Sequence, residues 1–130
     1  MKEHQNLFRD LQEDFRKMKK NLLVAQSGGP TAAINATLAG VIKQAIKEEQ
    51  IDQVYGACYG IQGVLEQKFV NLTEKVDTEE KLEKLKRTPA AALGSCRFKL
   101  NDIKEDDSQY QEIVDILHKM NIGYFVYIGG

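Results

Sequence analysis

Residues 21–39 read NLLVAQSGGPTAAINATLA, and this stretch joins a short apolar run to a helical pattern through two adjacent glycines. The apolar run at residues 22–25 is long enough for one buried strand. Beyond the glycines, apolar residues recur at helical spacing at Ile34, Leu38, Val41, Ile42, Ala45 and Ile46. The stretch therefore predicts a strand that runs through a glycine turn into a helix.

The glycine pair, Gly28 and Gly29, suits a turn that binds phosphate. Glycines have no Cβ atom, so an anion can approach the backbone closely, and the following helix directs its positive end at the same point. Pro30 fits the first helical turn, where its missing N–H needs no partner. The spacing matches neither GxGxxG nor GxxxxGK[ST]. On spacing alone, a phosphate site and a tight structural corner remain equally good interpretations.

Composition restricts the class of protein. The chain has 130 residues, a net charge of -1, 42% hydrophobic and 28% charged residues, which is typical of a globular domain. This charge balance does not indicate nucleic acid or an acidic membrane as a partner. The chain has no apolar run of membrane-spanning length and no apolar signal core at its start. Cys58 and Cys96 fit neither a disulfide framework nor a metal site, so we expect a cytoplasmic protein.

Strand and helix patterns alternate along the rest of the chain. Further strands are expected at residues 52–58, 68–72 and 124–128, with a brief apolar run at residues 90–93 as another strand end, and helices are expected at residues 78–87 and 106–120. This order predicts an α/β class, with a three-layer, Rossmann-like and mostly parallel sheet. The run at residues 124–128 is apolar throughout, which predicts a strand covered on both faces.

Polar residues mark the ends of the two later helices. Thr78 is a suitable N-cap for the first of them. Ser108 and Gln111 match a capping box at the start of the second, and Asn121 and Gly123 are expected to end it.

The amino terminus forms a separate unit in this interpretation. Residues 1–19 carry Leu7, Phe8 and Leu11 at helical spacing and are expected to be a helical extension that docks elsewhere or is loosely held. Residues 20–130 are expected to form one α/β domain.

Loops after parallel strands meet at one edge of a sheet, where ligands bind. Four loops follow expected strand ends, at residues 27–31, 59–63, 94–99 and 129–130. Within the third loop, Arg97 could hold two phosphate oxygens at once and stabilise transferred charge. The alternative, an arginine paired with a carboxylate on the surface, is favoured when Arg97 is considered alone.

Three separated motifs resemble the phosphofructokinases. They are LLVAQSGGPTAAINA at residues 22–36, LGSCRF at residues 93–98, and IGYFVYIGG at residues 122–130. The resemblance implies phosphoryl transfer to the 1-hydroxyl of fructose 6-phosphate with Mg²⁺. By motif match, Gly28 and Gly29 would lie against the donor phosphates. Arg97 would bridge the donor and the transition state, and Phe98 would flank the donor site.

The phosphoryl donor stays open between pyrophosphate and ATP. The first two motifs look more like the pyrophosphate-dependent branch, and Ile61 stands where ATP-using members have a tyrosine. In the family, a metal-binding aspartate would follow Gly130, and the catalytic base and sugar ligands come later. We therefore expect no metal ligand in this chain and no turnover by it alone, and a homo-oligomer at full length. The competing interpretations are a non-catalytic phosphate- or nucleotide-binding module and an α/β domain without a ligand.

Overall fold

The computed structural model describes residues 2–26, 32–87, 92–94 and 107–128, with side chains for all of these except residues 2–5, 15–18 and 32–33. The elements in chain order are α1 (Lys2–Met18), β1 (Lys20–Gln26), α2 (Ala32–Lys47), β2 (Ile51–Ala57), α3 (Gly60–Leu65), β3 (Phe69–Asn71), α4 (Leu72–Lys75), α5 (Glu79–Lys86), α6 (Ser108–Lys119) and β4 (Ile122–Ile128).

The strands form one sheet in the order β3-β2-β1-β4. β1 pairs in parallel with both β2 and β4, and β3 is antiparallel to β2, so the predicted mostly parallel sheet is confirmed. In the register, Ala25 lies opposite Ala57, and Gln26 lies opposite Ile128. The carboxyl ends of the three parallel strands consequently lie at the same edge of the sheet.

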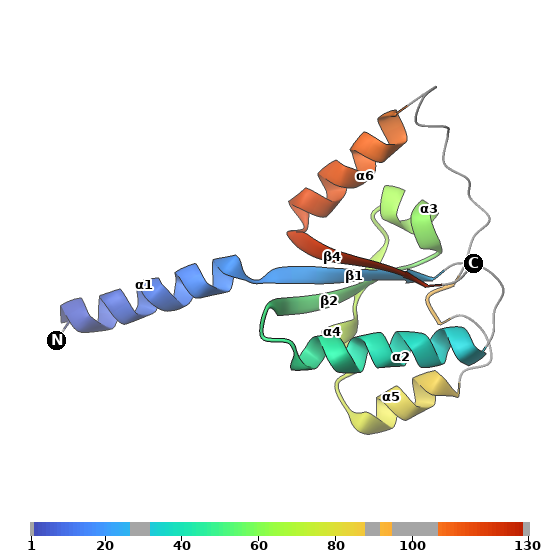
Figure 1. Ribbon diagram of the computed structural model, residues 1–130, viewed down its shortest axis with the longest axis horizontal. Coiled ribbons are helices and arrows are strands. Elements are labelled where there is room, and N and C mark those ends of the chain that lie inside the picture. Colours follow the sequence, from blue (N-terminus) through green and yellow to red (C-terminus); the bar gives the residue numbers. More distant parts are fainter. Residues whose placement is uncertain (1, 27–31, 88–91, 95–106, 129–130) are drawn as a thin grey trace.

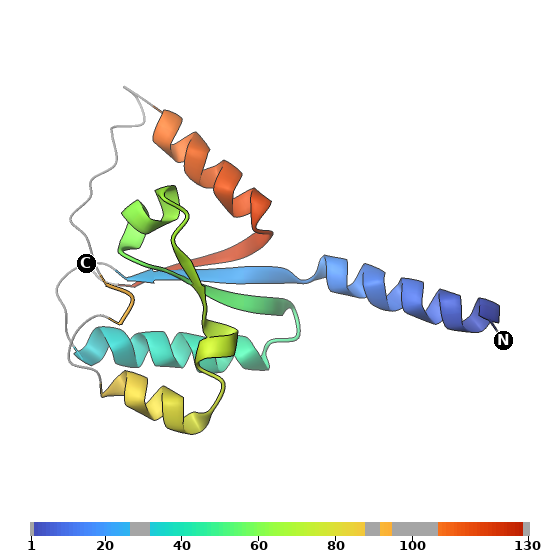
Figure 2. The same cartoon turned by 180° about the vertical axis from the view of Figure 1, so that it is seen from behind.

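Helices cover both faces of the sheet, which confirms the three layers. Figures 1 and 2 show α2 and α5 on one side of the sheet and α3 and α6 on the other. Alternate residues of β1 point into different cores: Leu22 and Val24 pack with the α2 side, whereas Leu23 packs with Val64 of α3. β1 is therefore a central strand with residues 22–26 fully inside the protein.

The buried face of α2 differs from the predicted one at its ends. Leu38, Ile42 and Ala45 are buried as predicted, but Ile46 is 51% exposed. Asn35 is fully buried instead. Asn35, Leu38, Ile42 and Ala45 recur at helical spacing on one face; Ile46 lies only about 40° from Ile42 around the helix, but it is the next-to-last residue of α2.

The two predicted helix caps have different outcomes. The Thr78 hydroxyl accepts a hydrogen bond from the Lys81 amide at 3.2 Å, which confirms this N-cap of α5. The predicted Ser108–Gln111 capping box is wrong because the N-cap of α6 is Asp107, so Ser108 is already inside the helix. The Gln111 side chain instead donates to Asp115 at 3.0 Å.

The end of α6 follows the prediction. Asn121 has a φ of 57°, a left-handed conformation that asparagine tolerates better than most residues and that ends the helix before β4.

One of the predicted loops has more regular structure than expected, and one predicted strand end has less. Residues 58 and 59 form a turn, and α3 begins at Gly60, so most of the predicted loop at residues 59–63 is helical. Tyr59 makes this sharp entry possible with a left-handed φ of 65°. The predicted strand end before residue 94 is a turn at Ala92 and Leu93.

The outer strand and the first helix are the least covered elements. Tyr124, Phe125 and Tyr127 of β4 are 41%, 37% and 43% exposed, so the prediction of a strand covered on both faces is wrong for the described structure. The cause is position: β4 is at the end of the strand order. α1 extends away from the sheet (Figure 1), and its Leu7, Phe8 and Leu11 side chains are exposed. Among the described residues, no helix has the length and apolar character needed to cross a membrane.

Candidate functional site

The candidate site lies at the carboxyl edge of the parallel strands. The predicted site residues Gly28, Gly29, Arg97 and Phe98 lie outside the described residues, as does Gly130. The structure does describe the residues that flank the predicted loops: Gln26 at the end of β1, Ile128 at the end of β4, and residues 92–94. The contacts of these flanking residues determine where the predicted loops begin.

Gln26 joins the end of β1 to the turn before residue 94. Its side chain is fully buried. The Leu93 backbone N–H donates to Gln26 Oε1 at 2.9 Å, across 67 residues of sequence. Gln26 Nε2 donates to Asn35 Oδ1 at 3.1 Å. One amide side chain therefore links the strand, the turn and α2.

Asn35 completes the connection from the first turn of α2. Asn35 Oδ1 accepts a hydrogen bond from the Ala92 backbone N–H at 2.9 Å as well as the one from Gln26. Buried polar atoms are costly without partners, and no described buried side-chain nitrogen or oxygen atom lacks one. The two amides thus satisfy the backbone N–H groups of two consecutive residues of this turn.

The other side of the turn contacts the end of β2. The Tyr59 backbone N–H donates to the Leu93 carbonyl oxygen at 2.8 Å. Gly94 has a φ of 77°, and a Cβ atom there would lie 2.7 Å from Cδ1 of the Tyr59 ring. Only glycine fits this position, for both its backbone conformation and its close neighbour. The turn at residues 92–94 is consequently held between β1, α2 and the β2 end.

The electrostatics of this edge favour an anion. α2 is 16 residues long, begins at Ala32, and carries no acidic residue in its first turn. The amino end of such a helix has a partial positive charge and unpaired backbone N–H groups. Since Gln26 and Asn35 are neutral amides, they add no charge that would repel a phosphate.

The displaced carboxyl pKa values belong to surface pairs and do not mark the site. A hydrogen bond from Lys68 lowers the pKa of Glu66, and one from Lys81 lowers the pKa of Asp77. All four side chains are substantially exposed, so these pairs add little to stability.

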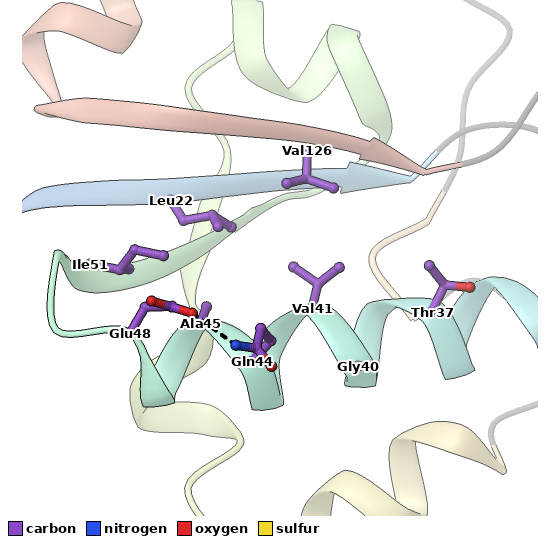
Figure 3. Close-up of a pocket in the computed structure, with 9 residues that line it drawn as sticks. All are labelled: Leu22, Thr37, Gly40, Val41, Gln44, Ala45, Glu48, Ile51 and Val126. Carbon is purple, nitrogen blue, oxygen red and sulfur yellow. Dashed lines mark hydrogen bonds between the residues drawn. The ribbon is translucent and has the colours of Figure 1, made fainter.

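A groove on the α2 face is a separate feature. It has a volume of about 520 Å³ and is lined by Leu22, Thr37, Gly40, Val41, Gln44, Ala45, Glu48, Ile51 and Val126. Figure 3 shows Leu22, Ile51 and Val126 facing it from the sheet, while Gln44 and Glu48 bond each other on α2. Its apolar lining offers no cation or array of N–H groups for a phosphate, so it is not the donor site.

The described part of the chain has no cluster of side chains suited to binding a metal ion. There, no group of three or more His, Cys, Asp or Glu side chains could hold a metal ion. Cys58 is half-buried with a free thiol.

The sequence contained a signal for the two amides that our predictions did not use. Gln26 is a polar residue directly after the apolar run of β1, and Asn35 shares a helix face with Leu38 and Ile42. A polar residue on a core face needs a buried partner. Two such residues nine positions apart, on either side of the Gly28–Gly29 sequence, could have been predicted to bond each other.

Comparisons with known proteins agree on one family. The phosphofructokinase family model matches residues 21–130. The chain is 42% identical over 112 residues to the pyrophosphate–fructose 6-phosphate 1-phosphotransferase of Rhodospirillum rubrum, covering 86% of this chain and 26% of the relative. The enzyme of the same name from Halomonas elongata is 40% identical over 111 residues, covering 85% and 26%.

Solved structures include a similar fold. The crystal structure of the pyrophosphate-dependent phosphofructokinase of Nitrosospira multiformis superposes with a TM-score of 0.76 at 36% identity, over 86% of this chain and 27% of that one. The chain thus spans about a quarter of the length of these relatives.

Proposed function

Because this chain belongs to the phosphofructokinase family, we propose that it forms the phosphoryl-donor side of a site that phosphorylates the 1-hydroxyl of fructose 6-phosphate. The observation that carries the proposal is the hydrogen bond between the Leu93 N–H and Gln26 Oε1. It joins the residue before the Ser27–Gly28–Gly29 sequence to the residue before Gly94. The segments that follow Gln26 and Leu93, which have the composition of phosphate-binding loops, therefore start close to each other.

The proposed roles follow from the chemistry of phosphoryl transfer, which needs alignment and charge neutralisation more than covalent participation. Gly28 and Gly29 donate backbone N–H groups to the donor phosphates, next to the amino end of α2. Arg97 binds two phosphate oxygens and stabilises the charge of the transferred group. Phe98 flanks the donor.

Pyrophosphate is the proposed donor. The curated relatives are named as pyrophosphate-dependent enzymes. Ile61, at the start of α3, offers an aliphatic side chain where the ATP-using members have an aromatic one. Without an adenine contact there, the phosphates supply most of the recognition.

This chain spans about a quarter of the length of its relatives, so the properties of the complete enzyme are proposed separately. We propose that the full-length protein is a cytoplasmic homo-oligomer that uses Mg²⁺. We further propose that residues 1–19 are a helical extension and residues 20–130 the donor domain, which agrees with a family match that starts at residue 21.

Isothermal titration calorimetry tests the donor assignment. The 130-residue chain is titrated with pyrophosphate and with ATP, and we expect pyrophosphate to bind more tightly. Arg97→Ala is expected to weaken pyrophosphate binding by about tenfold or more, as loss of a charged hydrogen-bonding partner costs about 1.5–3 kcal/mol.

Arg9→Ala is the control, because it removes the same side chain from α1, which extends away from the sheet (Figure 1). Equal weakening by both substitutions, or no binding of either donor to the folded chain, contradicts the proposal. Tighter binding of ATP contradicts the choice of donor only.

A further inference from the structure

We infer that Gln26 and Asn35 are positioning residues of the donor site: their buried amide pair sets the relative placement of the two segments that bind the donor. The inference depends on the proposed function. It assigns a role in donor binding to two residues that do not themselves touch the donor.

The pair is a directional connection and not merely packing. Gln26 Oε1 accepts from Leu93 N–H, and Asn35 Oδ1 accepts from Ala92 N–H, both at 2.9 Å. The bond of 3.1 Å between the two side chains ties these acceptors to each other. Hydrogen bonds require specific distances and angles, so this set fixes the turn in position and rotation against β1 and α2.

Apolar residues in this space would leave the buried Leu93 backbone N–H without its acceptor. Both amide side chains have an exposed fraction of 0%. A buried polar network whose members all have partners favours one arrangement of the backbone over others. A pair that holds one arrangement is useful where two segments must present groups to one ligand.

The remaining contacts of the turn make it rigid around the amide pair. The Leu93 carbonyl oxygen accepts from Tyr59 N–H at 2.8 Å. The Leu93 side chain packs on Gly56 of β2, where a Cβ atom would lie 2.8 Å from Leu93 Cδ2. With β2 holding one side, the amide pair decides where the turn lies relative to β1.

The placement matters because Gln26 directly precedes the Ser27–Gly28–Gly29 sequence, and Leu93 and Gly94 closely precede Arg97. Hydrogen bonds to a ligand weaken steeply when their distances and angles are lost, so two segments that bind one ligand must be correctly placed relative to each other. Loss of the pair is expected to shift Arg97 relative to the glycines, and so to weaken donor binding while most of the fold persists.

Two near-isosteric variants test this. Gln26→Met and Asn35→Leu retain side-chain volume but remove the hydrogen bonds. Ile42→Val is the control: it lies in α2, is fully buried, has no part in the network, and costs about 0.5–1.5 kcal/mol of stability. Circular dichroism and urea unfolding establish the folded fraction of each variant, and calorimetry then gives the pyrophosphate dissociation constant for folded protein.

We expect Gln26→Met and Asn35→Leu each to raise that dissociation constant by about tenfold or more, and Ile42→Val to leave it unchanged. If the parent chain binds pyrophosphate and the amide variants bind it equally well, the inference is wrong and the proposed function stands. If the parent chain does not bind pyrophosphate, the proposed function fails and the inference with it.

A second measurement needs no variant and decides the matter if the amide variants do not fold. Saturating pyrophosphate is expected to slow hydrogen exchange at the Ala92 and Leu93 amides of the parent chain by about tenfold, because donor binding favours the closed network. The reference is the backbone amide of Val54 in β2, which donates a hydrogen bond to Thr73 Oγ1 of α4. Equal slowing at all three amides, or none at Ala92 and Leu93, overturns the inference.

Discussion

Gly63 has no room for a side chain in the described structure. A Cβ atom there would lie 1.6 Å from the Cys58 carbonyl oxygen. The backbone of Gly63 also accepts a hydrogen bond from Lys68 N–H at 2.8 Å, so it cannot move away without breaking the connection to β3. We predict that Gly63→Ala lowers the free energy of unfolding by about 3 kcal/mol, the upper range for overpacking.

Gly40 supplies the matched control. It is in α2, and a Cβ atom there would have no neighbour within 4 Å. Gly40→Ala is expected to raise the free energy of unfolding by about 1 kcal/mol, because alanine favours the helix. Urea unfolding followed by circular dichroism measures both. Equal stability of the Gly63→Ala variant and the parent chain would contradict this description of α3.

At the scale of single residues, the sequence did not predict the contacts that the glycines make. Gly28 and Gly29 were assigned to phosphate binding, and no contact was predicted for Gly63 and Gly94, which the close approach of Cys58 and Tyr59 requires to be glycine. Those approaches depend on tertiary structure. Asn35 was missed because the predicted face of α2 was chosen by apolar residues only, which leaves out a polar residue with a buried partner.

At the scale of elements, α5 depends on its cap. Its sequence EEKLEKLK contributes one buried side chain, Leu82, so little apolar burial holds it. The Thr78 hydroxyl satisfies the Lys81 N–H. We predict that Thr78→Ala lowers the free energy of unfolding by about 1 kcal/mol.

Thr78→Ser keeps the hydroxyl and is expected to unfold like the parent chain in the same urea titration. A loss of stability in the serine variant equal to that in the alanine variant would show that the threonine methyl group, and not the cap, is responsible.

Element types were largely predictable because apolar periodicity differs between strands and helices. The first residues of the helices were less predictable than the element types. Thr78 and Ser108 look alike in sequence, yet only Thr78 caps a helix, since the backbone of Asp107 takes the capping position of α6. Cap choice depends on the conformation of one residue, which side-chain type alone does not determine.

At the scale of the whole molecule, β4 has a described neighbour only on its β1 side. Its Phe125 and Tyr127 rings stack with centroids 6.2 Å apart, and Tyr124 is 41% exposed. An outer strand with exposed aromatic residues promotes pairing between chains. We predict that the 130-residue chain self-associates, so that its average mass in sedimentation equilibrium rises with concentration.

Tyr124→Lys is expected to reduce this association, because a charge on an outer strand opposes pairing. Val114→Lys on α6 is the control, since Val114 is also 41% exposed but lies off the strand. Equal reduction by both variants would assign the association to another surface.

The fold class was predictable at this scale, because the alternation of patterns allows few topologies. The antiparallel direction of β3 and the exposure of β4 were not, since both depend on which strands are neighbours. For the site, the sequence predicted the edge of the sheet, and the connection between β1 and the turn at residues 92–94 required coordinates.

The central claim is that the segments after β1 and after Gly94 bind one pyrophosphate at the carboxyl edge of the sheet. A titration of the ¹⁵N-labelled chain with pyrophosphate, followed by amide chemical shifts, tests it most directly. The account predicts the largest shifts at Gly28, Gly29 and Arg97, with smaller ones at Gln26 and Gly94. Shifts confined to the opposite edge of the sheet, or none at saturating pyrophosphate, would contradict it.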